Sequence, residues 1–153
     1  MRTPRSKILS FALGLIFLLS VGSTEVKAQS TTWIGGELGD PSGLVLRPDY
    51  DGRGSLEFLA AWDLDEFFFL NVHRMIETPI EPNRPLYFMF GPGAFVGFED
   101  NGDDEAILGI SGRFGVGYGG RDYRIYLSVT PRLSLTPDTD GQVGGGLGVL
   151  FRL

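Results

Sequence analysis

The sequence contains no cysteine, a single histidine (His73) and only two lysines, Lys7 and Lys27, both near the amino terminus. The absence of cysteine excludes disulfides and a lipid anchor attached to a cysteine. The chain also lacks a recognisable nucleophile, metal-ligand or cofactor motif. These absences predict a protein without an assigned catalytic residue and without a cofactor.

The first residues have the pattern of a cleavable leader. Arg2, Arg5 and Lys7 precede an apolar stretch of 14 residues from Ile8 to Val21, and Val26-Lys27-Ala28 forms a small-residue cleavage site. The stretch is shorter than the roughly 20 residues that a membrane-spanning helix needs. We expect a signal peptide over residues 1–28 and one exported domain over residues 29–153.

The charge balance is acidic. The whole chain has 13 basic and 19 acidic residues, and 9 basic and 18 acidic residues remain after the expected leader is removed. A chain with this excess of negative charge is not expected to bind nucleic acid.

What the sequence does contain is one unit repeated eight times. Each unit is a run of alternating apolar and small or polar residues, closed by a turn rich in glycine, aspartate or proline. The expected strands are Thr31–Gly39, Gly43–Asp49, Ser55–Trp62, Phe67–Glu77, Leu86–Phe98, Ala106–Tyr118, Arg124–Leu135 and Gln142–Leu153. This pattern, with no helix, predicts an all-β fold: an eight-stranded antiparallel up-and-down transmembrane β-barrel.

Alternation alone does not say which face points outward, since a soluble periplasmic β-barrel that binds an apolar ligand has the same period with its apolar face inside. Two features favour the membrane barrel. The polar face is rich in glycine and carries no lysine, as expected inside a narrow barrel. An arginine on the lipid face near the midplane also costs about 2–4 kcal/mol. We therefore expect an interior polar network made of Glu37, Arg47, Glu57, Asn71, His73, Arg113, Arg132 and Arg152.

Three residues fit the expected strands poorly. Arg74 falls on the outward parity, although close to a strand end, where the cost of a lipid-facing arginine is only about 0–1 kcal/mol. Pro92 and Pro131 lie inside strands and cannot donate a ladder hydrogen bond. Because glycines flank Pro92, we expect a bulge or bend there.

The turns expected to face outward are acidic. The richest runs from Glu99 to Glu105, and its side chains Asp100, Asp103, Asp104 and Glu105 are candidate ligands for a divalent cation such as Ca²⁺. A solvated acidic surface explains the same residues without a bound metal, because the fixed ligand spacing of a calcium loop is missing.

A lipid-modifying hydrolase is a further alternative, and it depends on His73. This residue would have to lie beside a serine nucleophile, for which Ser111 and Ser128 are the inward-facing candidates. Aromatic residues have a different expected role: Trp62 and Phe67 to Phe69 would belong to an interfacial girdle, and Trp33 and Tyr87 to the interior or the girdle.

Three segments, Gly36 to Leu44, Gly91 to Phe98 and Leu108 to Gly112, resemble a group of small, poorly characterised outer-membrane β-barrel proteins. The architecture is similar to that of eight-stranded barrels of the OmpA/OmpX type. The resemblance implies a membrane barrel with no catalytic residues to carry over. We expect a structural or surface-interaction role in the outer membrane of a Gram-negative-type envelope, with membrane lipid and the barrel-insertion machinery as partners. The chain differs from the group in ending in Leu153 rather than an aromatic residue, and in its shorter loops.

Overall fold

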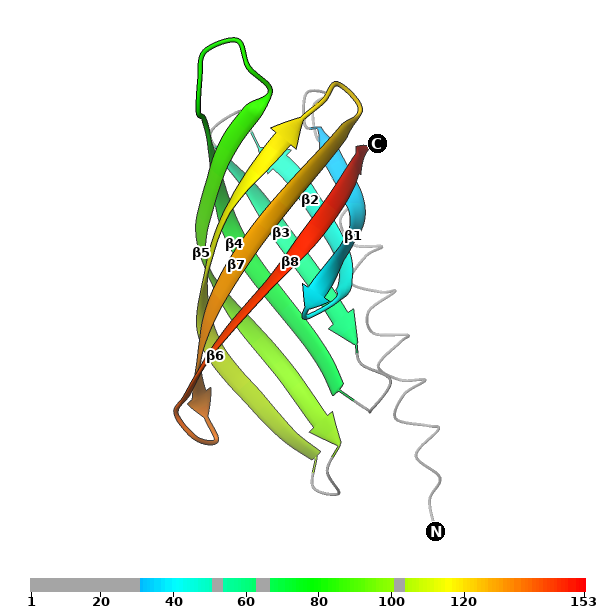
Figure 1. The fold of residues 1–153 in the computed structure, drawn as a ribbon. Coiled ribbons are helices and arrows are strands. Elements are labelled where there is room, and N and C mark those ends of the chain that lie inside the picture. The colour runs from blue at the N-terminus through cyan, green and yellow to red at the C-terminus, as the bar shows by residue number, and fades with distance from the viewer. Residues whose placement is uncertain (1–30, 51–53, 63–66, 101–103) are drawn as a thin grey trace.

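The computed structural model describes residues 31–50, 54–62, 67–100 and 104–153. These residues form eight β-strands: β1 (Thr32–Asp40), β2 (Gly43–Tyr50), β3 (Gly54–Trp62), β4 (Phe67–Pro79), β5 (Leu86–Asp100), β6 (Asp104–Gly119), β7 (Tyr123–Thr136) and β8 (Asp140–Arg152). Each strand pairs antiparallel with the next, and β1 pairs with β8, which closes the barrel (Figure 1). The fold class expected from the sequence is confirmed, and each observed strand end lies within two residues of its expected position. In the described part of the chain, no helix is long and apolar enough to cross a membrane.

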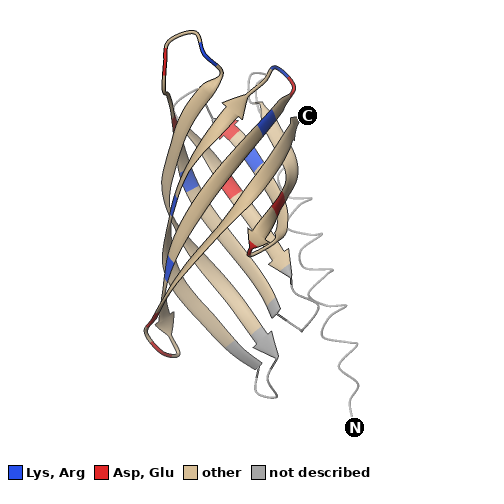
Figure 2. Ribbon diagram, viewed as in Figure 1, with Lys and Arg blue, Asp and Glu red and all other residues tan. Residues whose placement is uncertain are grey.

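The alternating sequence places apolar side chains on the outside of the barrel, while the inside holds polar side chains together with apolar ones such as Leu59, Met75 and Met89. In β7, Tyr126, Ser128 and Thr130 are buried in the lumen, while Leu127 and Val129 between them are exposed. Successive side chains of a strand point to opposite faces, so this arrangement follows directly from the period of two. The ribbon in Figure 2 accordingly shows few charged positions along the barrel wall, separated by long uncharged stretches.

The strands tolerate their prolines without bulges. On one side of Pro92, the pairing of β4 with β5 is interrupted between His73↔Gly93 and Ile76↔Phe90, yet the register is the same before and after the gap. Of the bulge or bend expected at Pro92, the bulge is therefore absent. A register shift occurs instead in the β6–β7 ladder, between Leu108 and Gly109. A missing N–H removes ladder hydrogen bonds on one side of the strand, and this loss does not require an extra residue.

The two ends of the barrel differ. Both ends of the described chain lie at one end, where Leu153 N–H donates to the carbonyl of Thr32 at 2.9 Å. At the opposite end the wall is uneven, because β1, β2 and β3 have 8 or 9 residues whereas β4 to β8 have 13 to 16. The β1–β2 turn consequently lies well short of the β7–β8 turn (Figure 1).

Candidate functional site

The lumen is filled by a continuous chain of ion pairs in which the sign of the charge alternates. In order along the chain of contacts, its members are Asp49, Arg124, Glu77, Arg47, Glu57, Arg113 and Glu37. The nitrogen–oxygen distances include 2.8 Å for Arg124 to Glu77, 2.8 Å for Arg47 to Glu77 and 3.0 Å for Arg113 to Glu57. We call this set the luminal ion-pair chain. Each of its arginines contacts at least two carboxylates.

The centre of this chain is completely withdrawn from solvent. Arg47, Glu57 and Arg113 have 0% of their surface exposed, and they come from three different strands, β2, β3 and β6. An ionised group buried without a partner is very costly, so these groups stabilise the fold only as a set. A narrow eight-stranded barrel brings them into contact because its interior is just wide enough for side chains.

Glycines on the inward face make room for the larger luminal side chains. A Cβ placed on Gly117 would meet the ring of Tyr87, and one placed on Gly148 would meet the ring of Tyr126. The ring of Tyr126 lies in this space, and its hydroxyl donates a hydrogen bond to Glu37 at 2.8 Å. The guanidinium of Arg47 lies 5.3 Å from the centre of the Tyr126 ring. Glycine-rich inward positions and bulky polar ones therefore complement each other across the lumen.

His73, Asn71 and Ser111 form a second buried cluster. Ser111 Oγ donates to Asn71 Oδ1 at 3.0 Å and lies 3.0 Å from Nε2 of His73. Which of the two atoms donates depends on the tautomer of His73. Ser111, and not Ser128, is therefore the serine that the structure places beside His73. The other ring nitrogen of His73, Nδ1, lies 4.0 Å from Glu57 Oε1.

The uneven end of the lumen is closed by a cation and two rings. Arg132 pairs with the exposed Asp40 at 3.3 Å, and its guanidinium lies 5.3 Å from the centre of the Phe69 ring. Phe69 packs against Phe95 with ring centres 5.1 Å apart. Phe69 is therefore a luminal residue, which corrects its expected place in an interfacial girdle. Phe69 shares the inward parity of Asn71 and His73 on the same strand, so the alternation that placed those two residues inside also indicated this position.

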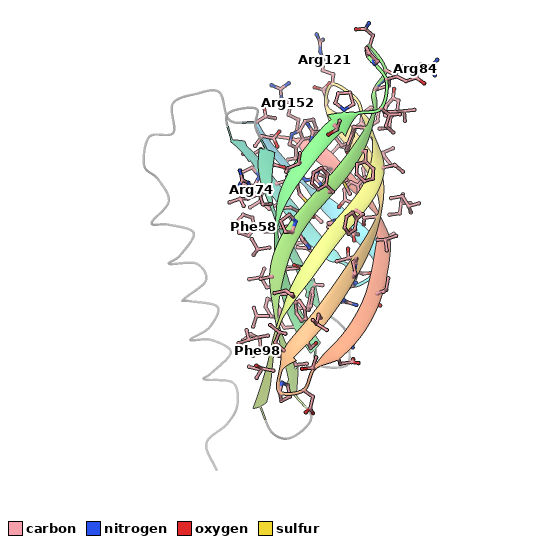
Figure 3. The ribbon with its side chains drawn as sticks, turned by 90° about the vertical axis from the view of Figure 1, so that its left-hand side faces the viewer. Phe58, Arg74, Arg84, Phe98, Arg121 and Arg152 are labelled. Atoms are coloured by element: carbon pink, nitrogen blue, oxygen red, sulfur yellow. The ribbon has the colours of Figure 1, made fainter. Side chains whose placement is uncertain are left out.

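The structure places most of the expected interior network in the lumen. Glu37, Arg47, Glu57, Asn71, His73, Arg113 and Arg132 are all buried there. Arg152 is different: it is the last residue of β8 and is exposed at the rim (Figure 3). Its position at a strand end leaves no wall beyond it to cover the side chain.

Sequence reasoning missed four members of the luminal network: Asp49, Glu77, Arg124 and Tyr126. The signal was available for all four, because each shares the inward parity of a residue already placed inside: Asp49 that of Arg47, Glu77 that of His73, and Arg124 and Tyr126 that of Ser128. Trp33 and Tyr87, expected in the interior or the girdle, are buried in the interior, at 4% and 8% exposure.

The side chains of the acidic turn from Glu99 to Glu105 lie outside the described part of the chain. Asp103 lies outside the described residues, as do the side chains of Asp100, Asp104 and Glu105; the backbone pairs Asp100 with Asp104 at the end of the β5–β6 ladder. Within the part of the chain that is described, no group of three or more potential ligands could hold a metal ion. The cation site expected on the Glu99–Glu105 turn therefore stays a prediction.

Comparisons with known proteins agree with this architecture. The chain is similar to the solved structure of the N-terminal β-barrel domain of OprF from Pseudomonas aeruginosa, with a TM-score of 0.56 and 15% sequence identity. The match covers 81% of this chain and 96% of that domain. At this identity the likeness concerns the β-barrel fold alone. No protein-family model and no curated protein matches the chain.

Proposed function

We propose that the chain is a small integral outer-membrane protein whose barrel has a structural or surface-interaction role and a lumen closed to diffusion. The observation that carries this proposal is the inverted distribution of polarity. Phe151 and Val129, on the outer wall, are 58% and 51% exposed, whereas Arg47 and Arg113 are completely buried inside. Exposing these apolar side chains to water would cost free energy, whereas contact with the hydrocarbon of a bilayer would stabilise the barrel.

The same observation speaks against the soluble barrel with an apolar ligand, because that protein needs its apolar residues inside. The described lumen holds the luminal ion-pair chain beside a buried cluster that includes Leu59, Met75 and Met89, and buried charges of this kind do not suit an apolar ligand. The proposed partners are membrane lipid around the wall and the insertion machinery during assembly. Acidic outer turns, free or with a divalent cation, would supply the surface for interactions.

Cell fractionation tests the proposal directly. We expect the protein in the outer-membrane fraction, resistant to alkaline carbonate extraction, and migrating faster on a gel when it is not boiled. Recovery in the periplasmic supernatant after osmotic shock would show that the wall does not face lipid. The proposal would then have to be abandoned.

A further inference from the structure

An apolar groove runs along the outer wall of the barrel where β8, β1 and β2 meet. Its volume is about 480 Å³, and the side chains around it are those of Leu38, Leu44, Leu147, Val149 and Phe151. Leu38 and Phe151 are 75% and 58% exposed, so the groove opens outward and not into the lumen. We call it the β1–β8 groove.

The groove exists because Gly36 has no side chain. Gly36 occupies an outward position of β1 and has Leu44 and Val149 as its cross-strand neighbours. A Cβ placed there would have the carbonyl oxygen of Gly43 as its nearest atom, at 3.5 Å, which is an ordinary contact. At the adjacent Gly35, by contrast, a Cβ would collide with the backbone of Val149. Packing therefore requires glycine at position 35 but not at position 36, where the missing side chain leaves space on the lipid side.

We infer that the β1–β8 groove binds one acyl chain of a phospholipid. This inference rests on the proposed function, since it requires the outer wall to face lipid. Two polar residues border the groove, Ser42 and Glu37, and the carboxylate of Glu37 is engaged in the lumen by Arg113 and Tyr126. An alkyl chain lying in the groove touches protein on several sides, whereas one on a flat wall touches it on one side, and such van der Waals contacts drive association within lipid.

The rim of the barrel supplies a partner for the headgroup. Arg152 directly follows Phe151, which lines the groove, and its side chain is exposed at the end where the described chain begins and ends (Figure 3). A guanidinium at this position can form charge-assisted hydrogen bonds with a phosphate. The bound lipid therefore has its phosphate at Arg152 and its acyl chain directed along β1 toward Leu38.

Lipid retention by the purified full-length protein tests the inference. The protein is extracted in mild detergent, supplied with equal amounts of phosphatidylglycerol and phosphatidylcholine, and examined by native mass spectrometry. We expect one retained phospholipid, and a several-fold loss of it in Gly36→Leu, which fills the groove. The matched control is Gly112→Leu, another glycine exchange on the outward face, on β6, which should retain lipid as the wild type does. Arg152→Gln should weaken retention of both lipids, since both carry the phosphate.

A photoreactive phospholipid provides a measurement that does not depend on a variant. With a diazirine at the end of its acyl chain, it should label peptides from β1, β2 and β8 of the wild-type protein. Labelling spread evenly over all eight strands would overturn the inference, as would equal retention in Gly36→Leu and wild type, or equal loss in Gly112→Leu. Recovery of the protein in the soluble fraction without detergent would instead count against the proposed function.

Discussion

The side chains of Glu57 on β3 and Arg113 on β6 meet across the lumen, with Oε1 of Glu57 3.0 Å from Nε of Arg113. Both are completely buried, and the same carboxylate also pairs with Arg47. One glutamate therefore pairs with two buried guanidinium groups, whose second carboxylate partners are Glu77 and Glu37. The stability of the barrel should depend on this residue more than on any ion pair at the surface.

Replacing Glu57 by glutamine keeps its shape and removes its charge, which leaves Arg47 and Arg113 with fewer carboxylate partners. We expect the free energy of unfolding to fall by about 3–5 kcal/mol, the usual result of breaking a buried ion pair. Urea unfolding in lipid vesicles, followed by tryptophan fluorescence, measures this change. The control is Glu81→Gln, which breaks the exposed pair of Glu81 with Arg84 and should cost about 0–1 kcal/mol. Equal effects of the two variants would contradict the central role of Glu57.

An arginine placed on the outer wall should destabilise the barrel by an amount that depends on how deep in the bilayer it lies. Val129 lies near the middle of β7 and is 51% exposed, whereas Tyr123 begins the same strand. In a bilayer, Val129→Arg should destabilise the barrel by about 2–4 kcal/mol and Tyr123→Arg by about 0–1 kcal/mol. Reversible folding into vesicles distinguishes the two variants. If both were neutral, the wall would be facing water.

The strands could be predicted from the sequence because alternation is a local property. Each strand carries its own inward and outward residues, and turn formers mark its ends. Parity likewise placed Arg47 and Arg113 inside. The contacts between them could not be predicted, because the pairing of Glu57 with Arg113 depends on how far neighbouring strands are staggered around the closed barrel. The residues of a single strand do not indicate that stagger.

The expectations that failed share a physical reason. Arg152 has the inward parity, but it is the last residue of its strand, and parity does not reveal where the wall ends. The glycines beside Pro92 predict a bulge or bend, but the barrel has no bulge there: it keeps its register and omits the ladder pairing on one side of Pro92. Both outcomes depend on how a strand lies against its neighbours in the barrel, which the alternation within that strand does not indicate.

The complementary packing of glycine and tyrosine in the lumen leads to a third prediction. Gly148→Ala would drive a methyl group into the ring of Tyr126, which is 1% exposed and held by its hydrogen bond to Glu37. We expect a loss of about 1–3 kcal/mol, typical of overpacking. Gly36→Ala, on the outer wall, should change stability little. Comparable losses in both variants, measured by the same urea titration, would show that backbone strain and not luminal packing is responsible.

The filled lumen should not conduct ions as an open channel does. The side chains of Arg47, Glu57, Met75, Met89 and Leu150 have no exposed surface. Wild-type protein inserted into a planar bilayer is therefore expected to give no stepwise currents. Steps that recur with each insertion event, and that are absent when protein is omitted, would show that the luminal side chains leave a path.

The arrangement of Ser111 and His73 bears on the hydrolase alternative. The distance of 3.0 Å between Ser111 Oγ and His73 Nε2 would suit a nucleophile and its base, but both residues are buried, with 9% and 0% of their surface exposed. A nucleophile also needs access to its substrate. We therefore expect no labelling of the folded barrel by a fluorophosphonate probe, and no change in the lipid A or phospholipid species of cells carrying His73→Ala, as measured by mass spectrometry. Labelling that disappears in Ser111→Ala and in His73→Ala but persists in Ser128→Ala would establish Ser111 as a reactive serine, and the luminal cluster would then be a catalytic site.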